Sequence, residues 1–272
     1  HRFVDFRANL KMPRATLTAR LSLLVAHRML ERKARDGSFR KSYRLTKTGL
    51  RHYEYALALT RFGDRWLAGG KPPPLRLRHV CGRFLGAEPH CDHCGERIKD
   101  ADVRFAEAGS RARGVAFARR TRASGNPAAY LRGRDTSVAR ALTEIGDRWS
   151  LLVVYEALVR PRRFEDFERN LGVAPNILAD RLRYLTDAGL MARARRGSPR
   201  RLEYRLTRTG KALHEVVLAL LGWACRWLGA EPRDRPRHRC GRAADIAYRC
   251  LGCGKFVEPT DVVVTRGRAP AA

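Results

Sequence analysis

The sequence has few acidic residues and no long hydrophobic run. Its 272 residues include 27 Asp and Glu against 56 Lys and Arg, which gives a formal net charge of +29 and an isoelectric point near 11.2. No apolar stretch is long enough to span a bilayer and no long amphipathic basic helix is evident, so no membrane partner is expected. A chain this basic repels itself unless a polyanion neutralises it. Double-stranded DNA is the expected partner.

Motifs of the common catalytic classes are also missing. The chain has no phosphate-cradling glycine loop, no nucleophile elbow and no catalytic dyad that spacing supports. Glu165, Asp166 and Glu168 lie close together in sequence, but on a short amphipathic helix they are expected to form a solvated face and caps. We therefore expect a binding protein and not an enzyme.

The seven cysteines do not look like the disulfide framework of a secreted protein. Most are grouped as CxxC pairs with a histidine nearby, which is typical of metal ligands in a reducing compartment. The chain starts at His1 without a Met or a signal sequence. We expect a cytoplasmic protein, and we expect this sequence to be a fragment of it.

The chain repeats itself at an offset of 161 residues. Residues 2–10 read RFVDFRANL and residues 163–171 read RFEDFERNL, and the run YRLT occurs at 43–46 and again at 204–207. With 44% hydrophobic residues and this length, the chain can form about two domains that each bury a core. We therefore predict a duplicated domain. Further matches at the same offset are Leu17 with Leu178, Arg20 with Arg181, Leu21 with Leu182, Leu24 with Leu185, Gly49 with Gly210 and Trp66 with Trp227.

The second copy predicts a helix-turn-helix. Apolar spacing favours helices over 138–145 and about 148–158, the second of them apolar on most faces and therefore central and buried. A short helix over 164–171 is followed by Pro175, which suits the first turn of the next helix. In that fourth helix the leucines face inward.

A hairpin and a final helix are expected to follow. Residues 190–195 and 202–206 flank a Gly-Ser-Pro turn, and apolar residues alternate with charged ones in the second strand, which predicts a wing. Thr207 is expected to cap a last helix whose apolar stripe carries Trp223 and Trp227. A stripe of that kind predicts a partner helix.

The segments IGDRWSLLVVYEAL, RFEDFERNL, LADRLRYLTDAGL and EYRLTRTG resemble the HxlR-type winged helix-turn-helix family of bacterial regulators over about the whole of each repeat. The resemblance implies a homodimeric DNA binder that dimerises through its terminal helices, reads the major groove with its fourth helix and contacts flanking backbone with its wing. This chain departs from the family by carrying two modules, which predicts an intramolecular pseudo-dimer or a homodimer. Its first copy also lacks the two helices that open the second, which predicts an incomplete core there.

The predicted fold is mainly α with small β-hairpin wings, in which tandem winged helix-turn-helix domains are each followed by a small Cys/His ribbon. The expected boundaries are 1–70 for the first winged helix-turn-helix, 71–104 for its ribbon, 105–134 for a basic linker, 135–230 for the second winged helix-turn-helix, 231–265 for its ribbon and 266–272 for a tail.

The fourth helix of the second copy is expected to read bases. Its helical register places Asn176, Asp180 and Arg183 opposite the buried leucines, and Asn and Arg can make bidentate base contacts. The second copy should therefore discriminate bases better than the first. The corresponding positions of the first copy are Ala15, Ala19 and Ser22, with Arg14 and Thr18 at the flanks.

Cations on both wings are expected to contact the phosphate backbone. An isolated run of charge on a hairpin is often only a solvated surface. Its position directly after a helix-turn-helix favours DNA contact here. These cations are Arg193, Arg195, Arg196, Arg200 and Arg201 in the second copy, and Arg32, Lys33, Arg35, Arg40 and Lys41 in the first.

After each last helix comes the pattern H-x-C-x9-C-x2-C. Three thiolates and an imidazole suit a structural, tetrahedral zinc ion that closes a small ribbon, and four protein ligands leave no open position for catalysis. The alternatives are a thiol redox switch, which would make the CxxC clusters the sensing element of a redox-responsive protein, and reduced cysteines with no such role. Cys225 is expected to be an ordinary buried cysteine. His90 and His93 are expected to be exposed bystanders, although either could substitute as a ligand. The expected ligands are His79, Cys81, Cys91 and Cys94 for one site and His238, Cys240, Cys250 and Cys253 for the other.

Overall fold

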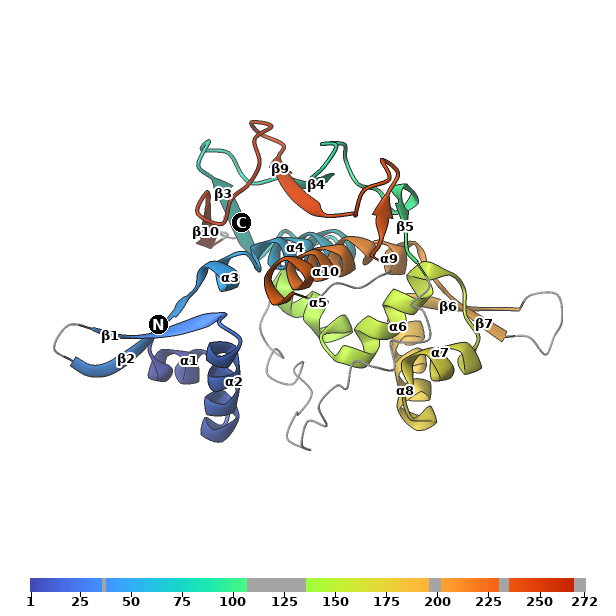
Figure 1. Ribbon diagram of the computed structural model, residues 1–272, viewed down its shortest axis with the longest axis horizontal. Helices are drawn as coiled ribbons and strands as arrows, with labels where there is room; N and C mark the ends of the chain where they lie inside the picture. The colour runs from blue at the N-terminus through green and yellow to red at the C-terminus, as the bar shows by residue number, and fades with distance from the viewer. Residues whose placement is uncertain (36–37, 107–135, 196–201, 230–234, 267–272) are drawn as a thin grey trace.

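The computed structural model places two small winged modules on either side of a central layer of helices, and short strands cover that layer on one side (Figure 1). Most of the predicted basic linker and the tip of the second wing lie outside the described residues. The structure describes residues 1–35, 38–106, 136–195, 202–229 and 235–266.

The first module is a helix pair followed by a two-stranded wing. Its elements are α1 (Phe3–Leu10), α2 (Arg14–Ala26), β1 (Leu30–Arg35) and β2 (Ser38–Leu45). The strands are antiparallel, with Leu30 opposite Leu45.

The second module has the same elements with one more helix before them, as the apolar spacing predicts. Asp147 begins the central helix, because its carboxylate accepts hydrogen bonds from the backbone N–H groups of Trp149 and Ser150. The module comprises α6 (Arg148–Val159), α7 (Phe164–Leu171), α8 (Pro175–Asp187), β6 (Met191–Arg195) and β7 (Leu202–Leu206).

Each wing is held against its helices by a glycine from the YRLTxxG motif. A Cβ atom on Gly49 would lie 2.1 Å from the carbonyl oxygen of Met29, and one on Gly210 would lie 2.0 Å from that of Leu190. Only glycine lets the two backbones approach this closely. The repeated sequence motif therefore marks a repeated backbone contact.

The central layer consists of the terminal helices of both copies. Thr207 does cap a helix, but this is the short α9, and the main terminal helix α10 begins only at His214, because the chain turns between them. The predicted single helix is therefore two. The layer comprises α3 (Lys47–Leu50), α4 (Tyr53–Trp66), α5 (Ser137–Ile145), α9 (Arg208–Lys211) and α10 (His214–Leu228).

The partner of the tryptophan-bearing helix α10 is α4 of the other copy. The indole N–H of Trp223 donates to the carbonyl of Thr48 at 3.1 Å, and its ring lies 4.7 Å from that of His52. Helix α5 packs closely on α4 as well, because Gly63 leaves room for the backbone of Ser137. The two copies therefore pack together within one chain.

Strands from the two copies pair with each other above this layer (Figure 1). All three pairings are antiparallel and each joins one copy to the other, so the expected ribbons that close within one copy are wrong. A short 3₁₀ helix, η1 (Asp100–Asp102), precedes the last strand of the first copy. The pairs are β3 (Leu75–His79) with β10 (Val262–Arg266), β4 (Ala87–Cys91) with β9 (Ile246–Cys250), and β5 (Val103–Arg104) with β8 (Arg237–His238).

The buried residues form two separate clusters. The larger contains the second module, the central helices and the ribbon strands, with Phe167, Leu178 and Leu185 fully buried. The smaller belongs to the first module and has only Leu17, Leu21 and Leu30 as its buried members among the described residues. No helix in the described parts of the chain is long and apolar enough to cross a membrane.

Candidate nucleic-acid interface and metal centres

Helix α8 buries one face and exposes the other, as its register predicts. Leu178 and Leu185 are fully buried, while Asn176, Asp180 and Arg183 are all exposed. Pro175 supplies the first turn, where a missing backbone N–H has no cost. The exposed face therefore carries an amide, a carboxylate and a guanidinium within two turns of helix.

Two of these polar side chains form an ion pair. A guanidinium nitrogen of Arg183 lies 2.6 Å from a carboxylate oxygen of Asp180, and both side chains are well exposed. An exposed pair three residues apart adds little stability. Its effect is to hold the guanidinium along the outer face of the helix.

The equivalent face of α2 in the first module is exposed but nearly apolar. Ala15, Ala19 and Ser22 are all exposed there, and so are Arg14 and Thr18 at its flanks. Ser22 on this face contacts its own wing: Arg32 donates to its hydroxyl at 3.3 Å. The exposed faces of the two helices thus differ in chemistry.

The wings carry exposed cations in equivalent places. Arg193 lies over the ring of Tyr204 at 5.9 Å, and Arg32 lies over the ring of Tyr43 at 5.7 Å. Each arginine is thereby held by the opposite strand of its hairpin. Arg195 and Lys33 are exposed as well. Arg196, Arg200 and Arg201 lie outside the described residues, as do the side chains of Arg35, Arg40 and Lys41.

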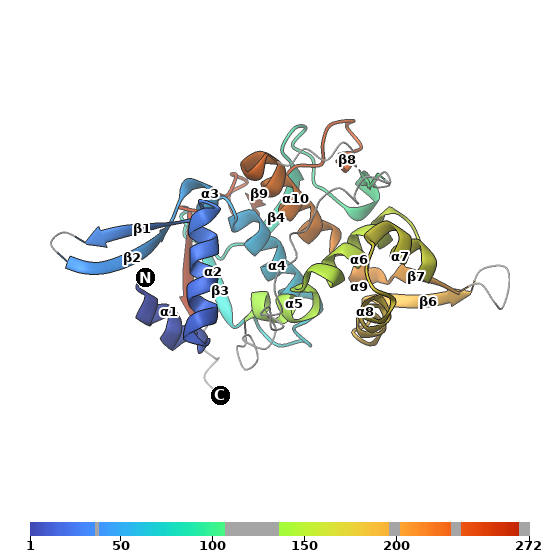
Figure 2. The same ribbon diagram turned by 60° about the horizontal axis from the view of Figure 1, so that its bottom comes forward.

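The second helix of each helix-turn-helix, α2 or α8, lies on the same side of the molecule. In Figure 1, α2 and α8 both project downward from the central layer, away from the ribbon strands. Figure 2 shows the two wings extending toward opposite ends of the molecule. The surface formed by α2, α8 and the two wings is called the lower face below.

The eight predicted ligands form two clusters, but each cluster takes its residues from both copies. Within each cluster the ligand atoms lie within 4.8 Å of one another. The expectation that each set closes within its own copy is therefore wrong, although all eight residues take part. Cluster A comprises His79, Cys81, Cys250 and Cys253, and cluster B comprises Cys91, Cys94, His238 and Cys240.

The exchange follows from the strand pairing. Strands β4 and β9 are antiparallel, with Cys91 opposite Ile246 and Ala87 opposite Cys250, so their two CxxC turns lie at opposite ends of the pair. Strands β3 and β8, each paired with a strand of the other copy, bring an HxC segment to each end. Spacing along the chain could not reveal this.

The spacing of the ligand atoms fits a tetrahedral metal ion. The sulfurs of Cys81 and Cys250 are 4.0 Å apart, and the Nδ1 atom of His79 is 3.6 Å from the sulfur of Cys253. In cluster B the sulfurs of Cys91 and Cys240 are 3.9 Å apart. A zinc ion with bonds of about 2.3 Å to sulfur and about 2.0 Å to nitrogen would separate two sulfurs by about 3.8 Å. Both clusters could therefore hold a metal.

The cysteine thiols within the clusters do not all have the same pKa. A hydrogen bond from the backbone of Arg83, supported by the His79 side chain, lowers the pKa of Cys81 to about 7. The backbone of Arg242 does the same for Cys240. Burial instead raises the pKa of Cys91 to about 11. Each cluster thus has one exposed thiol that deprotonates readily, which is the form a metal binds.

One of the two ligand histidines has a carboxylate close to its other ring nitrogen. Both histidines are buried, and the Nε2 atom of His79 lies 3.9 Å from a carboxylate oxygen of Asp261. A carboxylate behind a histidine ligand commonly fixes the ring in this way. Asp261 was missed from the sequence, although an aspartate lies eight residues after the last cysteine of each CxxC pair.

The remaining sequence predictions for this region are mixed. His90 and His93 are outside both clusters: His90 contacts the carbonyl of Gly95 at 2.9 Å, and His93 lies 3.6 Å from Asp245. Cys225 is only half-buried, and the prediction of an ordinary buried cysteine is wrong.

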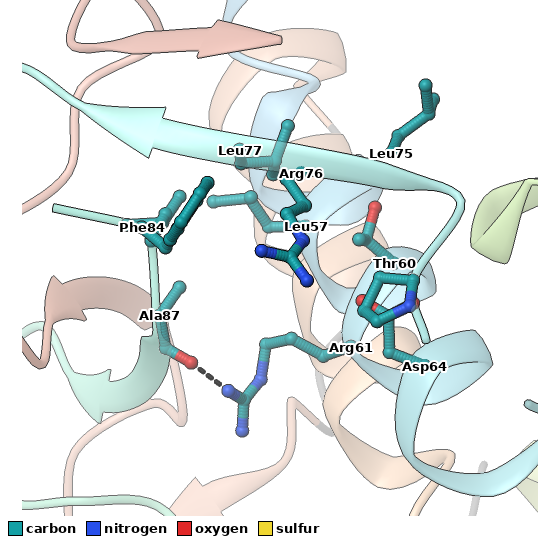
Figure 3. Close-up of a pocket in the computed structure, with 11 residues that line it drawn as sticks. Leu57, Thr60, Arg61, Asp64, Leu75, Arg76, Leu77, Phe84 and Ala87 are labelled. Carbon is teal, nitrogen blue, oxygen red and sulfur yellow. Dashed lines mark hydrogen bonds between the residues drawn. The ribbon is translucent and has the colours of Figure 1, made fainter. Parts of the chain in front are cut away.

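A hollow of about 270 Å³ lies between α4 and the ribbon strands (Figure 3). Its walls are mostly apolar and include Leu57, Leu77 and Phe84, and the guanidinium of Arg76 lies 4.9 Å from the centre of the Phe84 ring. Arg61 lies at its edge but is already engaged, since it donates to the carbonyl of Ala87 and to the carboxylate of Glu215. This guanidinium serves the packing of the layers.

Comparison with known proteins identifies the chain's relatives. It is 38% identical over 136 residues to the HTH-type transcriptional regulator Rv3095 of Mycobacterium tuberculosis, a match that covers 48% of this chain and 85% of that protein. It is 32% identical over 91 residues to the HTH-type transcriptional regulator YvaP of Bacillus subtilis, covering 33% of this chain and 84% of that protein. The crystal structure of PA1607, a candidate transcription factor, matches with 34% identity and a TM-score of 0.46, covering 50% of this chain and 97% of that one.

A model of the HxlR-like helix-turn-helix family matches residues 144–232, which run from the end of α5 through α10. This segment includes both helices of the helix-turn-helix and the second wing. With the identity to Rv3095 over most of that protein, the match confirms the resemblance seen in the sequence. The chain belongs to the HxlR-like helix-turn-helix family of transcriptional regulators.

Proposed function

We propose that the chain is a DNA-binding regulator in which the two modules form an intramolecular pseudo-dimer and address two half-sites. Helices α2 and α8 enter successive major grooves, and the wings contact flanking phosphates. The observation that carries the proposal is the lower face, where Asn176 and Arg183 are exposed beside the exposed wing cations Arg193 and Arg195. A DNA partner and thiolate ligands are both consistent with a cytoplasmic protein.

Selection of bound sequences from random duplexes across a salt series tests this proposal. A sequence motif with two half-sites is expected, together with binding that weakens steeply as salt rises. Salt-sensitive binding without an enriched motif would contradict sequence-specific regulation.

Two substitutions separate base reading from phosphate contact. Arg183→Ala is expected to relax the preference at one base by about 1–3 kcal/mol, because it removes a bidentate donor. Arg195→Ala is expected to weaken binding to all sequences alike and to reduce the salt dependence by about one counterion. Arg104→Ala, an exposed arginine on β5 in the ribbon layer, is the charge-matched control. Equal effects of all three would refute the assigned roles.

We propose further that clusters A and B bind structural zinc. Each offers three sulfurs and one imidazole nitrogen at tetrahedral spacing, which fills the coordination of the ion and leaves no open position. Two zinc ions per chain are expected by elemental analysis of purified protein. A chain that is reduced, folded and free of metal after growth in zinc-containing medium would contradict the proposal.

A thiol-sensing function is the second candidate, favoured by the two sulfur pairs that face each other across the copies at 3.9 and 4.0 Å. In that case two thiols would form a disulfide, losing two electrons and two protons to a peroxide that is reduced to water. Thiol titration before and after mild peroxide distinguishes the two. Loss of zinc and of two thiols per cluster, with altered DNA binding, favours sensing, whereas inert clusters favour a structural role.

A further inference from the structure

Clusters A and B each take two ligands from the first copy and two from the second. In cluster A, His79 and Cys81 face Cys250 and Cys253, and cluster B is the reverse arrangement. From this exchange we infer that the two metal sites are clamps: each ion binds both copies at once and fixes the two winged modules into one body. The inference rests on the zinc binding proposed above, and it does not require that DNA be the partner.

The strands that carry the ligands are too short to hold together alone. The pairings β3–β10 and β4–β9 each contain five residue pairs, and β5–β8 contains two. Two-stranded sheets of this size are marginal in water. Four of the ligating cysteines are exposed, so the turns that carry them bury little apolar surface of their own. The inner residues of these strands pack in the larger core, and a metal ion bound to both strands would add free energy of folding at the exposed turns.

At cluster A, the clamp acts on the helices below through the segment that follows the CxxC turn of the second copy. The hydroxyl of Tyr53 on α4 donates to the carbonyl of Val257 at 2.5 Å, and Arg51 lies 2.6 Å from Glu258. Both acceptors follow the CxxC turn of the second copy, whereas both donors belong to the first. Ordering cluster A therefore ties the first module's terminal helix to the second copy as well.

A pair of double variants tests whether the ligands are shared. Cys81→Ser with Cys253→Ser removes two ligands from cluster A and none from cluster B, so one tightly bound zinc ion should remain per chain. Cys81→Ser with Cys94→Ser removes one ligand from each cluster, which weakens both sites. A chelator chosen so that the unmodified chain keeps two zinc ions should therefore remove both ions from this variant. All three cysteines are exposed, and each variant carries two identical changes, which makes the pair a matched control.

Native mass spectrometry reads the zinc count together with the mass of the assembly. One ion in the first variant and none in the second, in single chains, is the expected result. If the sites instead closed within each copy, the counts would be reversed, and the clamp would be wrong. If zinc counts of one and none were found only in assemblies of two chains, the ligands would be shared between chains. That result would overturn the intramolecular clamp.

Hydrogen exchange in the first variant tests the clamping itself. Exchange in β3, β9 and β10 is expected to quicken about tenfold or more, because these strands of both copies depend on cluster A. Strands β5 and β8 should stay protected, since cluster B is intact. Loss of protection confined to one copy, or no change in any strand, would overturn the inference.

The outcomes distinguish failure of the clamp from failure of the proposed function. An unmodified chain without zinc contradicts zinc binding itself, whereas two ions with the reversed variant pattern contradict only the sharing. Neither result depends on DNA. A chain with shared zinc sites but no selected DNA motif would leave the clamp standing and refute the regulator proposal.

Discussion

The two winged modules share a sequence motif but differ in what lies under their recognition helices. In the second module, α6 packs behind α8 and Phe167 is fully buried. In the first, the equivalent Phe6 is only half-buried, and the described residues offer α2 no counterpart of α6. Similar sequences therefore form the same helix-turn-helix in both modules, whereas the elements packed against it set its stability.

The lower face shows the same contrast in chemistry. Asn176, Asp180 and Arg183 occupy positions where α2 has two alanines and a serine. The wings, by comparison, are nearly equivalent, since each has an arginine over a tyrosine ring. In the proposed DNA complex, backbone contact is therefore shared by the two modules, and base reading belongs mainly to the second.

The largest expected effect comes from the core. Phe167→Ala should lower the free energy of unfolding by about 3–5 kcal/mol, because it empties a fully buried site. Phe6→Ala, at the equivalent position, should cost about half as much and should affect only the small cluster of the first module. Urea unfolding of the two variants, followed by hydrogen exchange, measures both. Equal losses would show that the modules share one core.

A second comparison concerns two equivalent glutamates. Glu215 accepts from Arg61 and from the hydroxyl of Tyr248, each at 2.8 Å. Glu54 is just 7% exposed and has Arg226 at 3.9 Å as its nearest cation, so burial raises its pKa to about 7. The native state therefore binds this proton more tightly than the unfolded chain does.

The sign of the resulting pH effect follows directly. Between pH 4.5 and 7 the unfolded chain releases the Glu54 proton first, so this group makes the protein less stable as pH rises. Glu54→Gln should remove that slope and raise the stability at pH 8 relative to the unmodified chain, by roughly 2–3 kcal/mol. Glu215→Gln, the matched control, should instead lower stability, since it weakens two hydrogen bonds. Unfolding of both variants at saturating zinc checks this, and an unchanged slope in Glu54→Gln would contradict it.

The smallest expected effect is on base reading. Giving α2 the face of α8, with Ala15→Asn, Ala19→Asp and Ser22→Arg, should sharpen the first half-site by about 1–3 kcal/mol at one or two bases. The unfolding free energy should change little, because all three positions are exposed. Selection of bound DNA from random duplexes, for the unmodified chain and for the triple variant, measures the base preference of the first half-site. If the first half-site stayed as degenerate as before, the positioning of α2 and not its side chains would limit reading.

Much of the local structure could be predicted from the sequence. The apolar spacing placed α5, α6, α7 and α8 within a residue or two, and the wing strands of the second module lie where alternation predicts them. The split of the final helix into α9 and α10 was missed, because no proline separates the cap at Thr207 from the apolar stripe that begins at Leu213. The cap at Thr207 was found because capping depends on nearby backbone N–H groups.

The sequence alone determined the duplication, the element order of each module, the basic surface and the eight residues that converge on two clusters. Each of these depends on periodicity or on residue types close together in the chain. Tertiary structure alone decided that α4 pairs with α10 and that His79 meets Cys253 instead of Cys94. The physical reason is that two near-identical repeats offer chemically identical partners at identical spacing. Which copy supplies each ligand is then set by the antiparallel pairing of β4 with β9, a contact between residues about 160 positions apart.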